Sequence, residues 1–316
     1  MQPDTILSNE TSPSVTIILP TIGRPDYVAN TIRSLLLQDY GSFDILISDN
    51  APKTPTRTVL ASENISDPRI SIIERTVRLP FSLHMNACIA AATGEYIMIV
   101  SDDDQLSPGY ITEMVRCVTT DPQVSVCIGQ QKLISESDKG LVPADGFDKP
   151  GDCFEGAQFL KDSLSGRLQQ NIVTYISLFA RKSDIVDIGG FKEYPDGSHA
   201  DNYILVNLAL RGKVSIGATL MLYRVYLASA GLSTPFSNLL TATQQYSADC
   251  KLAIDNSPSI SRNDRNHINK LLKRSNCAML VSRLRTVYAR KLNLAERVKC
   301  SLLVWQFRIM PVHYPR

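Results

Sequence analysis

Short apolar runs alternate with helical patterns over the first hundred residues, and this alternation restricts the chain to a small set of folds. Val15–Pro20 (VTIILP) and Phe43–Ser48 (FDILIS) have the length and composition of buried strands, and Tyr27–Gln38 between them has its apolar residues at helical spacing. The same reading predicts further strands at 70–73 and 96–100 and a helix at 82–92. Because buried strands that alternate with helices form parallel sheets, we expect an α/β fold with a Rossmann-like, mostly parallel sheet flanked by helices.

The rest of the chain divides into an irregular middle and a helical end. Residues 133–170 are rich in Gly, Asp, Ser and Pro and predict a loop, Ile172–Phe179 predicts a strand, and Tyr203–Leu210 predicts a helix. From about residue 238 the pattern is helical and increasingly basic. A chain of 316 residues with 44% apolar residues can bury one large core, or such a core with a smaller appended part. The expected division is a polar leader at 1–13, a main domain at 14–235 with halves at 14–130 and 131–235, and a C-terminal helical region at 236–316.

The charge distribution excludes one broad class of partner. Residues 251–316 carry 14 Lys and Arg against 3 acidic residues, whereas the remainder carries 19 against 28. An acidic body with a basic end argues against general nucleic-acid binding.

The seven cysteines include no CxxC pair, so we expect reduced thiols. The start of the chain lacks the pattern of a signal peptide, and no run of about 18 apolar residues occurs, which predicts a cytoplasmic protein.

Three adjacent carboxylates, Asp102, Asp103 and Asp104, follow the predicted strand at 96–100. Close carboxylates repel one another unless a cation is present, and hard oxygen ligands select magnesium, manganese or calcium. A solvated acidic turn before Pro108 is the alternative. Two more polar groups stand at the carboxyl ends of predicted strands, where ligands collect in parallel sheets.

The first of these groups is Asp49 and Asn50, and the second contains Thr21 and Arg24. Asp49 is suited to accept the imide hydrogen of uracil or thymine, and Asn50 to reach a ribose hydroxyl. A strand-ending turn explains the same two residues equally well. Thr21 and Arg24 are placed to frame a nucleobase or phosphate, although Arg24 has a second interpretation as a surface residue.

Four blocks of sequence, in order, carry a resemblance to a known family. They are VTIILPTIGRPDYVANTIRSLLLQDY, FDILISDN, VRLPFSLHMNACIAAATGEYIMIVSDDDQLSPGY and IGGFKEYPDGSHADNYILVNLALRGK. Together, over about residues 14–215, they resemble the family 2 glycosyltransferases, which have the GT-A fold, invert the sugar and usually need a metal. The resemblance implies a nucleotide-sugar-binding half at 14–130 and an acceptor half at 131–235.

The resemblance also implies roles for single residues. Asp103 corresponds to the usual ligand of Mn²⁺ or Mg²⁺, with Asp102 and Asp104 as register alternatives, and Asp201 corresponds to the general base. Asp201 has a competing interpretation as a helix N-cap. His199 has a competing interpretation as a solvated loop histidine. Contacts to the donor are implied for Pro20, Thr21, Arg24, Asp49, Asn50, Arg78, Asn86, Ser101 and Asp102, and contacts to the acceptor for Gly190 and His199.

The chain departs from the family pattern at four places. Ser101 replaces the first Asp of the metal motif, and Met85 replaces the Arg that precedes Asn86. Arg78 and Pro80 stand where the family has an Asn-x-Gly, so Arg78 is a candidate to take over part of the phosphate charge. Ala200 replaces the Glu that precedes the base.

The C-terminal end has a pattern of its own. Leu294, Val298, Leu302, Trp305 and Ile309 form one apolar stripe of a helix in 292–310, flanked by Arg290, Lys291, Arg297, Lys299 and Arg308. A basic amphipathic helix that contains Trp suits the face of an anionic membrane, and packing on the main domain is the alternative. Attachment to the inner face of the cell membrane would suit a polyprenyl-diphosphate-linked saccharide acceptor.

These observations predict an inverting glycosyltransferase of surface polysaccharide biosynthesis that uses a UDP- or dTDP-sugar. One competing function is a nucleotidyltransferase that makes an activated sugar, but TIGRPDYVA lacks the glycines of its phosphate loop. A second is a binding module for nucleotide or sugar that has lost its chemistry, which Ser101 and Ala200 favour.

Overall fold

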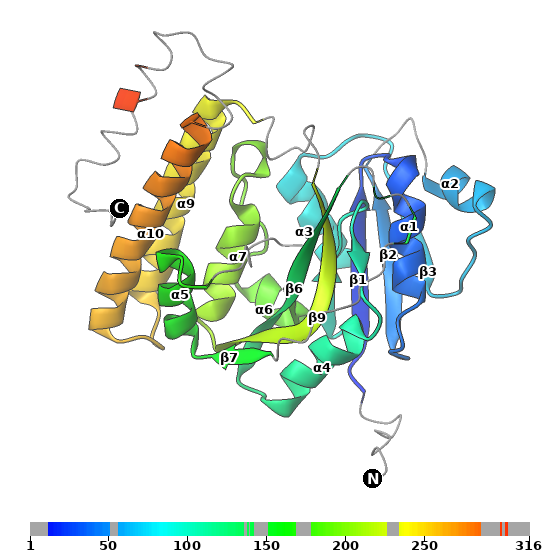
Figure 1. The fold of residues 1–316 in the computed structure, drawn as a ribbon, viewed down its shortest axis with the longest axis horizontal. Coiled ribbons are helices and arrows are strands. Elements are labelled where there is room, and N and C mark those ends of the chain that lie inside the picture. Colours follow the sequence, from blue (N-terminus) through cyan, green and yellow to red (C-terminus); the bar gives the residue numbers. More distant parts are fainter. Residues whose placement is uncertain are drawn as a thin grey trace.

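The computed structural model describes residues 12–50, 56–135, 138, 140–141, 151–168, 178–225, 234–285, 298 and 301–302. Over these residues the chain forms one mixed sheet with helices packed on it and a pair of long helices at one side (Figure 1). The strands lie in the order β3-β2-β1-β4-β8-β6-β9-β5, and β7 pairs with β9. The α/β class and the C-terminal helices predicted from the sequence are confirmed.

The N-terminal half is the parallel part of the sheet. β1 pairs in parallel with β2 and β4, and β2 with β3. Their apolar runs fill the core because nearly every residue of β1 and β4 is buried on both faces of the sheet. The elements are β1 (Val15–Thr21), α1 (Pro25–Leu36), β2 (Phe43–Asp49), α2 (Thr56–Ser62), β3 (Ile70–Glu74), α3 (Phe81–Ala91), β4 (Tyr96–Ile99), β5 (Gln105–Leu106) and α4 (Tyr110–Thr120).

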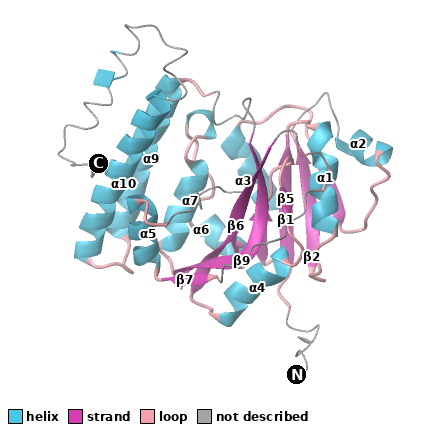
Figure 2. Ribbon diagram, in the orientation of Figure 1, coloured by secondary structure: helices cyan, strands magenta, loops and turns pink. Residues whose placement is uncertain are grey.

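The C-terminal half continues the same sheet with antiparallel and parallel pairs. β8 is antiparallel to β4 on one side and to β6 on the other, and it thereby joins the two halves of the sheet. The long strands β6 and β9 run in parallel and bend, and their pairing has two register shifts (Figure 2). The elements are β6 (Val124–Ser135), β7 (Asp152–Phe154), α5 (Gly156–Ser165), β8 (Leu178–Arg181), α6 (Lys182–Asp187), the 3₁₀ turn η2 (Pro195–Gly197), α7 (Ala200–Ala209), β9 (Lys213–Val225), α9 (Phe236–Asn256) and α10 (Arg262–Arg283).

The predicted loop at 133–170 is wrong in three places. β6 continues to Ser135, β7 adds a short strand to β9, and α5 is a helix with Phe159 and Leu160 buried. The polar composition of α5 concealed this helix, because only one narrow face packs against α7 and α10. Of the strand predicted at 172–179, only Leu178 and Phe179 lie in the described part, at the start of β8.

The helices α9 and α10 pack on the C-terminal half. Ala242, Tyr246 and Ile254 of α9 and Ile268 and Leu272 of α10 belong to the same buried cluster as the helices α5 and α7. Among the described helices, none has the length and apolar composition to cross a bilayer. Of the amphipathic pattern predicted at 292–310, only Val298 and Leu302 are described among the stripe residues, and both are exposed. The remainder of that prediction lies outside the described residues, as does most of the polar leader.

Candidate active site

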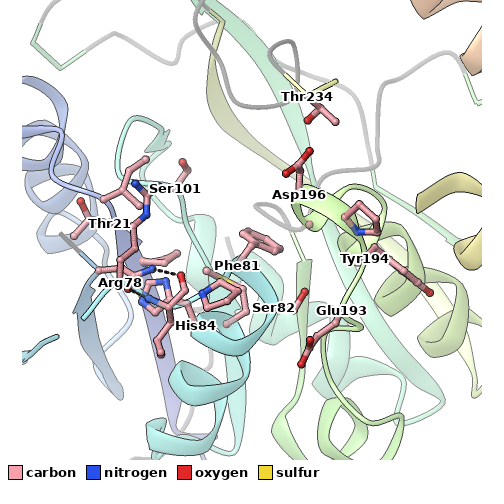
Figure 3. Close-up of a pocket in the computed structure, with 18 of the residues that line it drawn as sticks. Thr21, Arg78, Phe81, Ser82, His84, Ser101, Glu193, Tyr194, Asp196 and Thr234 are labelled. Carbon is pink, nitrogen blue, oxygen red and sulfur yellow. Dashed lines mark hydrogen bonds between the residues drawn. The ribbon is translucent and has the colours of Figure 1, made fainter. Parts of the chain in front are cut away.

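A cavity of about 770 Å³ opens at the carboxyl ends of the parallel strands. Its first wall contains Thr21 at the end of β1, Arg24 in the loop that follows and Arg78 before α3, and its second contains Glu193 and Asp196 (Figure 3). The N-terminal turn of α3 lies between the walls. The remaining lining residues are Pro20, Ile22, Asn50, Leu79, Pro80, Phe81, Ser82, His84, Met85, Ser101, Tyr194, Pro195, Gly197, Thr234 and Pro235.

The three adjacent carboxylates differ sharply in their surroundings. Asp104 is fully buried and its Oδ1 accepts a hydrogen bond from the backbone N–H of Arg224 at 2.8 Å. Burial, and then the charge of Asp103, raises the pKa of Asp104 well above its ordinary value, which favours the protonated form. Asp102 is also fully buried, and its Oδ2 accepts a hydrogen bond from Thr21 Oγ1 at 2.5 Å. Burial raises the pKa of Asp102, and the positive charge of Arg24 opposes that rise.

Asp103 has the most open side chain of the three, with 8% exposure. Its Oδ1 accepts a hydrogen bond from Ser101 Oγ at 2.5 Å, and its Oδ2 lies 2.5 Å from Nη1 of Arg24. Arg24 also forms an ion pair with Asp102. Arg24, predicted to frame the donor, therefore faces the acidic motif as well as the cavity.

The residues fit a divalent cation that binds together with its substrate. In the described part of the chain, no three His, Cys, Asp or Glu side chains are arranged to hold a metal ion. Mg²⁺ is often bound by one or two carboxylates, with substrate phosphates and water completing its shell. Asp103, beside a cavity with two arginines, offers one such carboxylate. Asp102 and Asp104 are less suited because both are fully buried.

Two residues predicted to contact the donor, Asp49 and Asn50, hold the backbone around the cavity. Asp49 is buried, and its Oδ2 accepts hydrogen bonds from the N–H and hydroxyl of Thr56 at 2.6 and 2.8 Å. Asn50 exchanges two hydrogen bonds with the backbone of Leu79, at 2.8 and 2.9 Å. Asn50 thereby fixes the segment that precedes α3, and it also lines the cavity.

Asn86 has the same kind of role on the second wall. Its side-chain amide exchanges two hydrogen bonds with the backbone of Phe191, at 2.8 and 2.9 Å. Gly190 precedes Phe191 with φ +63°, and a Cβ at this position would lie 2.4 Å from Asn86 Oδ1. The glycine is therefore required by packing against Asn86 as well as by its left-handed backbone. Ser82 of α3 also donates to the carbonyl of Lys192 at 2.6 Å, so that α3 connects both walls.

The segment 193–199 forms the second wall and is held by α9. Asn238 of α9 donates to Asp196 Oδ2 at 2.9 Å, and the hydroxyl of Tyr194 donates to Asp249 Oδ2 at 2.9 Å. Asp196 has φ +54°, a left-handed conformation that is uncommon for a residue with a side chain and that often marks functional sites. Sequence reasoning missed Glu193 and Asp196; the turn signal Pro-Asp-Gly at 195–197 marks this position.

The interpretation of His199 as a solvated loop histidine is wrong. Its ring stacks on Tyr246 with centroids 4.8 Å apart, and Nε2 lies 2.9 Å from the hydroxyl of Thr243. Because Thr243 donates its hydrogen to the carbonyl of Leu239, it accepts from Nε2, and Asn202 donates to Nδ1 at 3.4 Å. Burial, and then the charge of Arg283, lowers the pKa of His199 to about 4, so the ring is neutral at pH 7.

The buried histidine makes the stability of the fold depend on pH. An unfolded histidine has a pKa of 6.5, so between pH 6.5 and about 4 the unfolded state binds a proton that the folded His199 does not. The free energy of unfolding should therefore fall as pH drops through this window. Urea unfolding at pH 7.5 and pH 5 should show a larger loss for wild type than for His199→Asn, whereas His267→Asn, exposed on α10, should behave as wild type. Equal losses in wild type and His199→Asn would contradict this assignment.

Asp201 lies in the first turn of α7 and is partly exposed. The N-cap position belongs to His199, so the alternative interpretation of Asp201 as the N-cap is wrong. Asp201 lies outside the lining of the cavity as the described residues define it. Burial raises the pKa of Tyr223, and the charges of Asp104, Asp103 and Asp201 raise it further, so this phenol on β9 lies within electrostatic range of both the acidic motif and Asp201.

Comparison with solved structures supports the fold. The chain is similar to residues 1–349 of Staphylococcus aureus TarS in complex with UDP-GlcNAc, with a TM-score of 0.67 and 14% identity over 94% of this chain and 82% of that one. The same protein solved with UDP gives a TM-score of 0.64. At this identity the similarity establishes the fold alone.

Sequence comparison identifies relatives and a family. A putative colanic acid biosynthesis glycosyl transferase of Escherichia coli, WcaA, is 29% identical over 101 residues, which are 32% of this chain and 36% of the relative. A Campylobacter jejuni GalNAc(5)-diNAcBac-PP-undecaprenol beta-1,3-glucosyltransferase is 25% identical over 105 residues, which are 33% and 34%. The chain thus spans about a third of the length of either relative. The model of glycosyl transferase family 2 matches residues 16–179, more than half of the chain, a range that contains β2, β3, β4 and nearly all of β1, and the chain therefore belongs to this family.

Proposed function

We propose that this protein transfers a sugar, with inversion, from a nucleotide-sugar donor to an acceptor hydroxyl during the assembly of a surface polysaccharide. The observation that carries the proposal is the cavity of about 770 Å³ with its two unlike walls. Arg24 and Arg78 give the first wall a positive charge beside Asp103, and Glu193 and Asp196 give the second a negative one. A diphosphate suits the first wall, since guanidinium groups form charge-assisted hydrogen bonds with phosphate. Carboxylates of the second wall are suited to accept hydrogen bonds from acceptor hydroxyls.

Each half of the chain then has its own task. Residues 14–130 bind the donor, residues 131–235 bind the acceptor, and α9 supports the acceptor wall through its bonds to Tyr194, Asp196 and His199. Bound Mn²⁺ or Mg²⁺ at Asp103 would neutralise the charge that develops on the departing diphosphate. Asp201 acts as the general base that takes the proton of the attacking hydroxyl.

The relatives suggest the substrates. TarS has been solved with UDP and with UDP-GlcNAc, and the name of the Campylobacter relative describes an acceptor on undecaprenol diphosphate. A UDP- or dTDP-sugar donor and a polyprenyl-diphosphate-linked saccharide acceptor are therefore proposed for this chain.

The test is to incubate the protein with a panel of nucleotide sugars and Mn²⁺, with and without an extract that contains lipid-linked acceptors, and to measure the nucleoside diphosphate released. Release of a nucleoside diphosphate from one donor, stimulated by the acceptor, is the expected result. A nucleotidyltransferase would instead consume a sugar phosphate and nucleoside triphosphate and release pyrophosphate. A binding module would bind a nucleotide in calorimetry without releasing any product, and either outcome would overturn the proposal.

The basic C-terminal end is proposed to hold the enzyme at an anionic membrane. Five basic residues flank the apolar stripe of 292–310, and each contributes about 1 kcal/mol near an anionic surface. Truncation after residue 285 should abolish sedimentation with anionic vesicles and reduce activity on a lipid-linked acceptor more than on a short soluble analogue. Sedimentation at low and high salt is the measurement, because the electrostatic part is screened over about 8 Å at physiological ionic strength. Equal binding by both forms would show that this segment is not the attachment.

A further inference from the structure

Arg24 occupies the place beside the acidic motif that a metal ion would need. Its Nη1 lies 2.5 Å from Asp103 Oδ2, its Nη2 forms an ion pair with Asp102, and the same Nη2 lies 3.4 Å from Ser101 Oγ. The guanidinium thus contacts all three residues of the motif Ser101-Asp102-Asp103. Arg24 is the N-cap residue of α1, at the end of the loop that follows β1, and its carbonyl accepts hydrogen bonds from the N–H groups of Tyr27 and Val28.

Arg24 and a divalent cation cannot both remain on Asp103. Asp102 is fully buried and Asp103 nearly so, and the guanidinium supplies the positive charge that compensates the pair. A cation at Asp103 would share a carboxylate with Arg24 at a distance where like charges repel strongly. Metal binding to the protein alone must therefore displace Arg24 from at least one of its carboxylates, and the free energy of that displacement weakens the affinity for metal.

Arg24 has a second place to bind when a donor is present. Its side chain is 29% exposed and lines the cavity together with Arg78. A diphosphate in that cavity offers the paired oxygens that a guanidinium binds in bidentate fashion. We propose that Arg24 holds Asp102 and Asp103 in the absence of donor and moves to the diphosphate when the donor binds, so that the metal position opens only with the donor. This inference rests on the proposed function, because it assumes a donor diphosphate in the cavity.

The first measurement is the affinity for Mn²⁺ in the absence of nucleotide. The electron paramagnetic resonance signal of free Mn²⁺ reports how much of the ion is bound. Arg24→Gln keeps a hydrogen-bond donor but removes the charge, and it should bind Mn²⁺ at least about tenfold more tightly than wild type. Arg24→Ala should show the same gain if Arg24→Gln does not fold, as judged by thermal unfolding. The matched control is Arg78→Ala, which removes one positive charge from the same cavity and should change the affinity less than about twofold. An unchanged or weaker affinity in folded Arg24→Gln or Arg24→Ala, or an equal gain in Arg78→Ala, would overturn the proposal.

The second measurement is the affinity for UDP without metal, determined by calorimetry. Wild type should bind UDP more tightly than Arg24→Gln, because the guanidinium moves to the diphosphate. The same comparison with uridine, which lacks the diphosphate, should show no difference between the two proteins. A loss for UDP and uridine alike would assign Arg24 to the nucleoside and contradict the movement. Failure of wild type to bind any nucleotide would count against the proposed donor, while the Mn²⁺ titration would still report whether Arg24 excludes metal.

Discussion

Replacing Asp103 with Ala should reduce the rate of sugar transfer by about a hundredfold to a thousandfold. The physical reason is that a bound cation stabilises transition-state charge by several kcal/mol, and each 1.36 kcal/mol is a factor of ten in rate. Among the three adjacent carboxylates, Asp103 has the side chain with most exposure beside the cavity, whereas Asp102 and Asp104 are fully buried. The measurement is the initial rate of nucleoside diphosphate release with saturating Mn²⁺.

The fold of Asp103→Ala should persist. The variant loses one of the two ion pairs of Arg24, and the remaining pair with Asp102 still compensates the guanidinium charge, so that no buried charge is left without a partner. Asp121→Ala is the matched control. It also breaks an ion pair, that between Asp121 and Lys213, and neither of these residues lines the cavity. It should transfer sugar at the rate of wild type. Two results would contradict the proposed role of Asp103. One is full activity of wild type in EDTA, and the other is a rate in Asp103→Ala that exceeds a tenth of the wild-type rate.

Replacing Asp201 with Asn should reduce turnover by about a hundredfold or more while leaving donor affinity unchanged. An amide keeps the shape of the side chain but cannot take the proton of the attacking hydroxyl, and loss of a general base typically has an effect of this size. Two quantities are to be compared between wild type and Asp201→Asn: the rate of sugar transfer, and the affinity for UDP measured by calorimetry. Since Asp201 lies outside the described lining of the cavity, the prediction also tests whether α7 approaches the acceptor in the working enzyme.

A structural role for Asp201 predicts a different result. A carboxylate in the first turn of a helix stabilises it by about 0.3 to 1 kcal/mol through the helix dipole, and Asp184 also lies in the first turn of its helix, α6. Asp184→Asn loses this contribution together with ion pairs to Arg181 and Arg211, so it should be less stable but keep its activity. If Asp201→Asn retains more than about a tenth of the wild-type rate, the residue serves only the helix.

The parallel half of the fold was predictable because its signals are local. β1, β2 and β4 are buried on both faces, so each is a continuous apolar run that can be recognised without knowing its neighbours. The position of Asp102, Asp103 and Asp104 at a strand end followed directly from the run before them. The helices α9 and α10 were predictable for the same reason, since their apolar residues recur at helical spacing.

The acceptor half was less predictable because its elements depend on distant partners. β7 is three residues long and exists through pairing with β9, more than sixty positions along the chain. α5 has a polar composition and is stabilised by α7 and α10, which follow it much later. Propensity is weak in such short or polar segments, so that tertiary contacts decide their structure.

By itself, the sequence determined which residues are at the ends of the parallel strands, and Thr21, Asn50 and Ser101 among them line the cavity. Only the tertiary structure decided what each polar group contacts. Asn50 binds the backbone of Leu79, Asn86 that of Phe191, and Arg24 the carboxylates of the acidic motif. The physical reason is that a buried polar side chain must satisfy its hydrogen bonds with whatever the fold brings near it, and these partners lie 29, 105 and 79 positions away, where no local pattern identifies them.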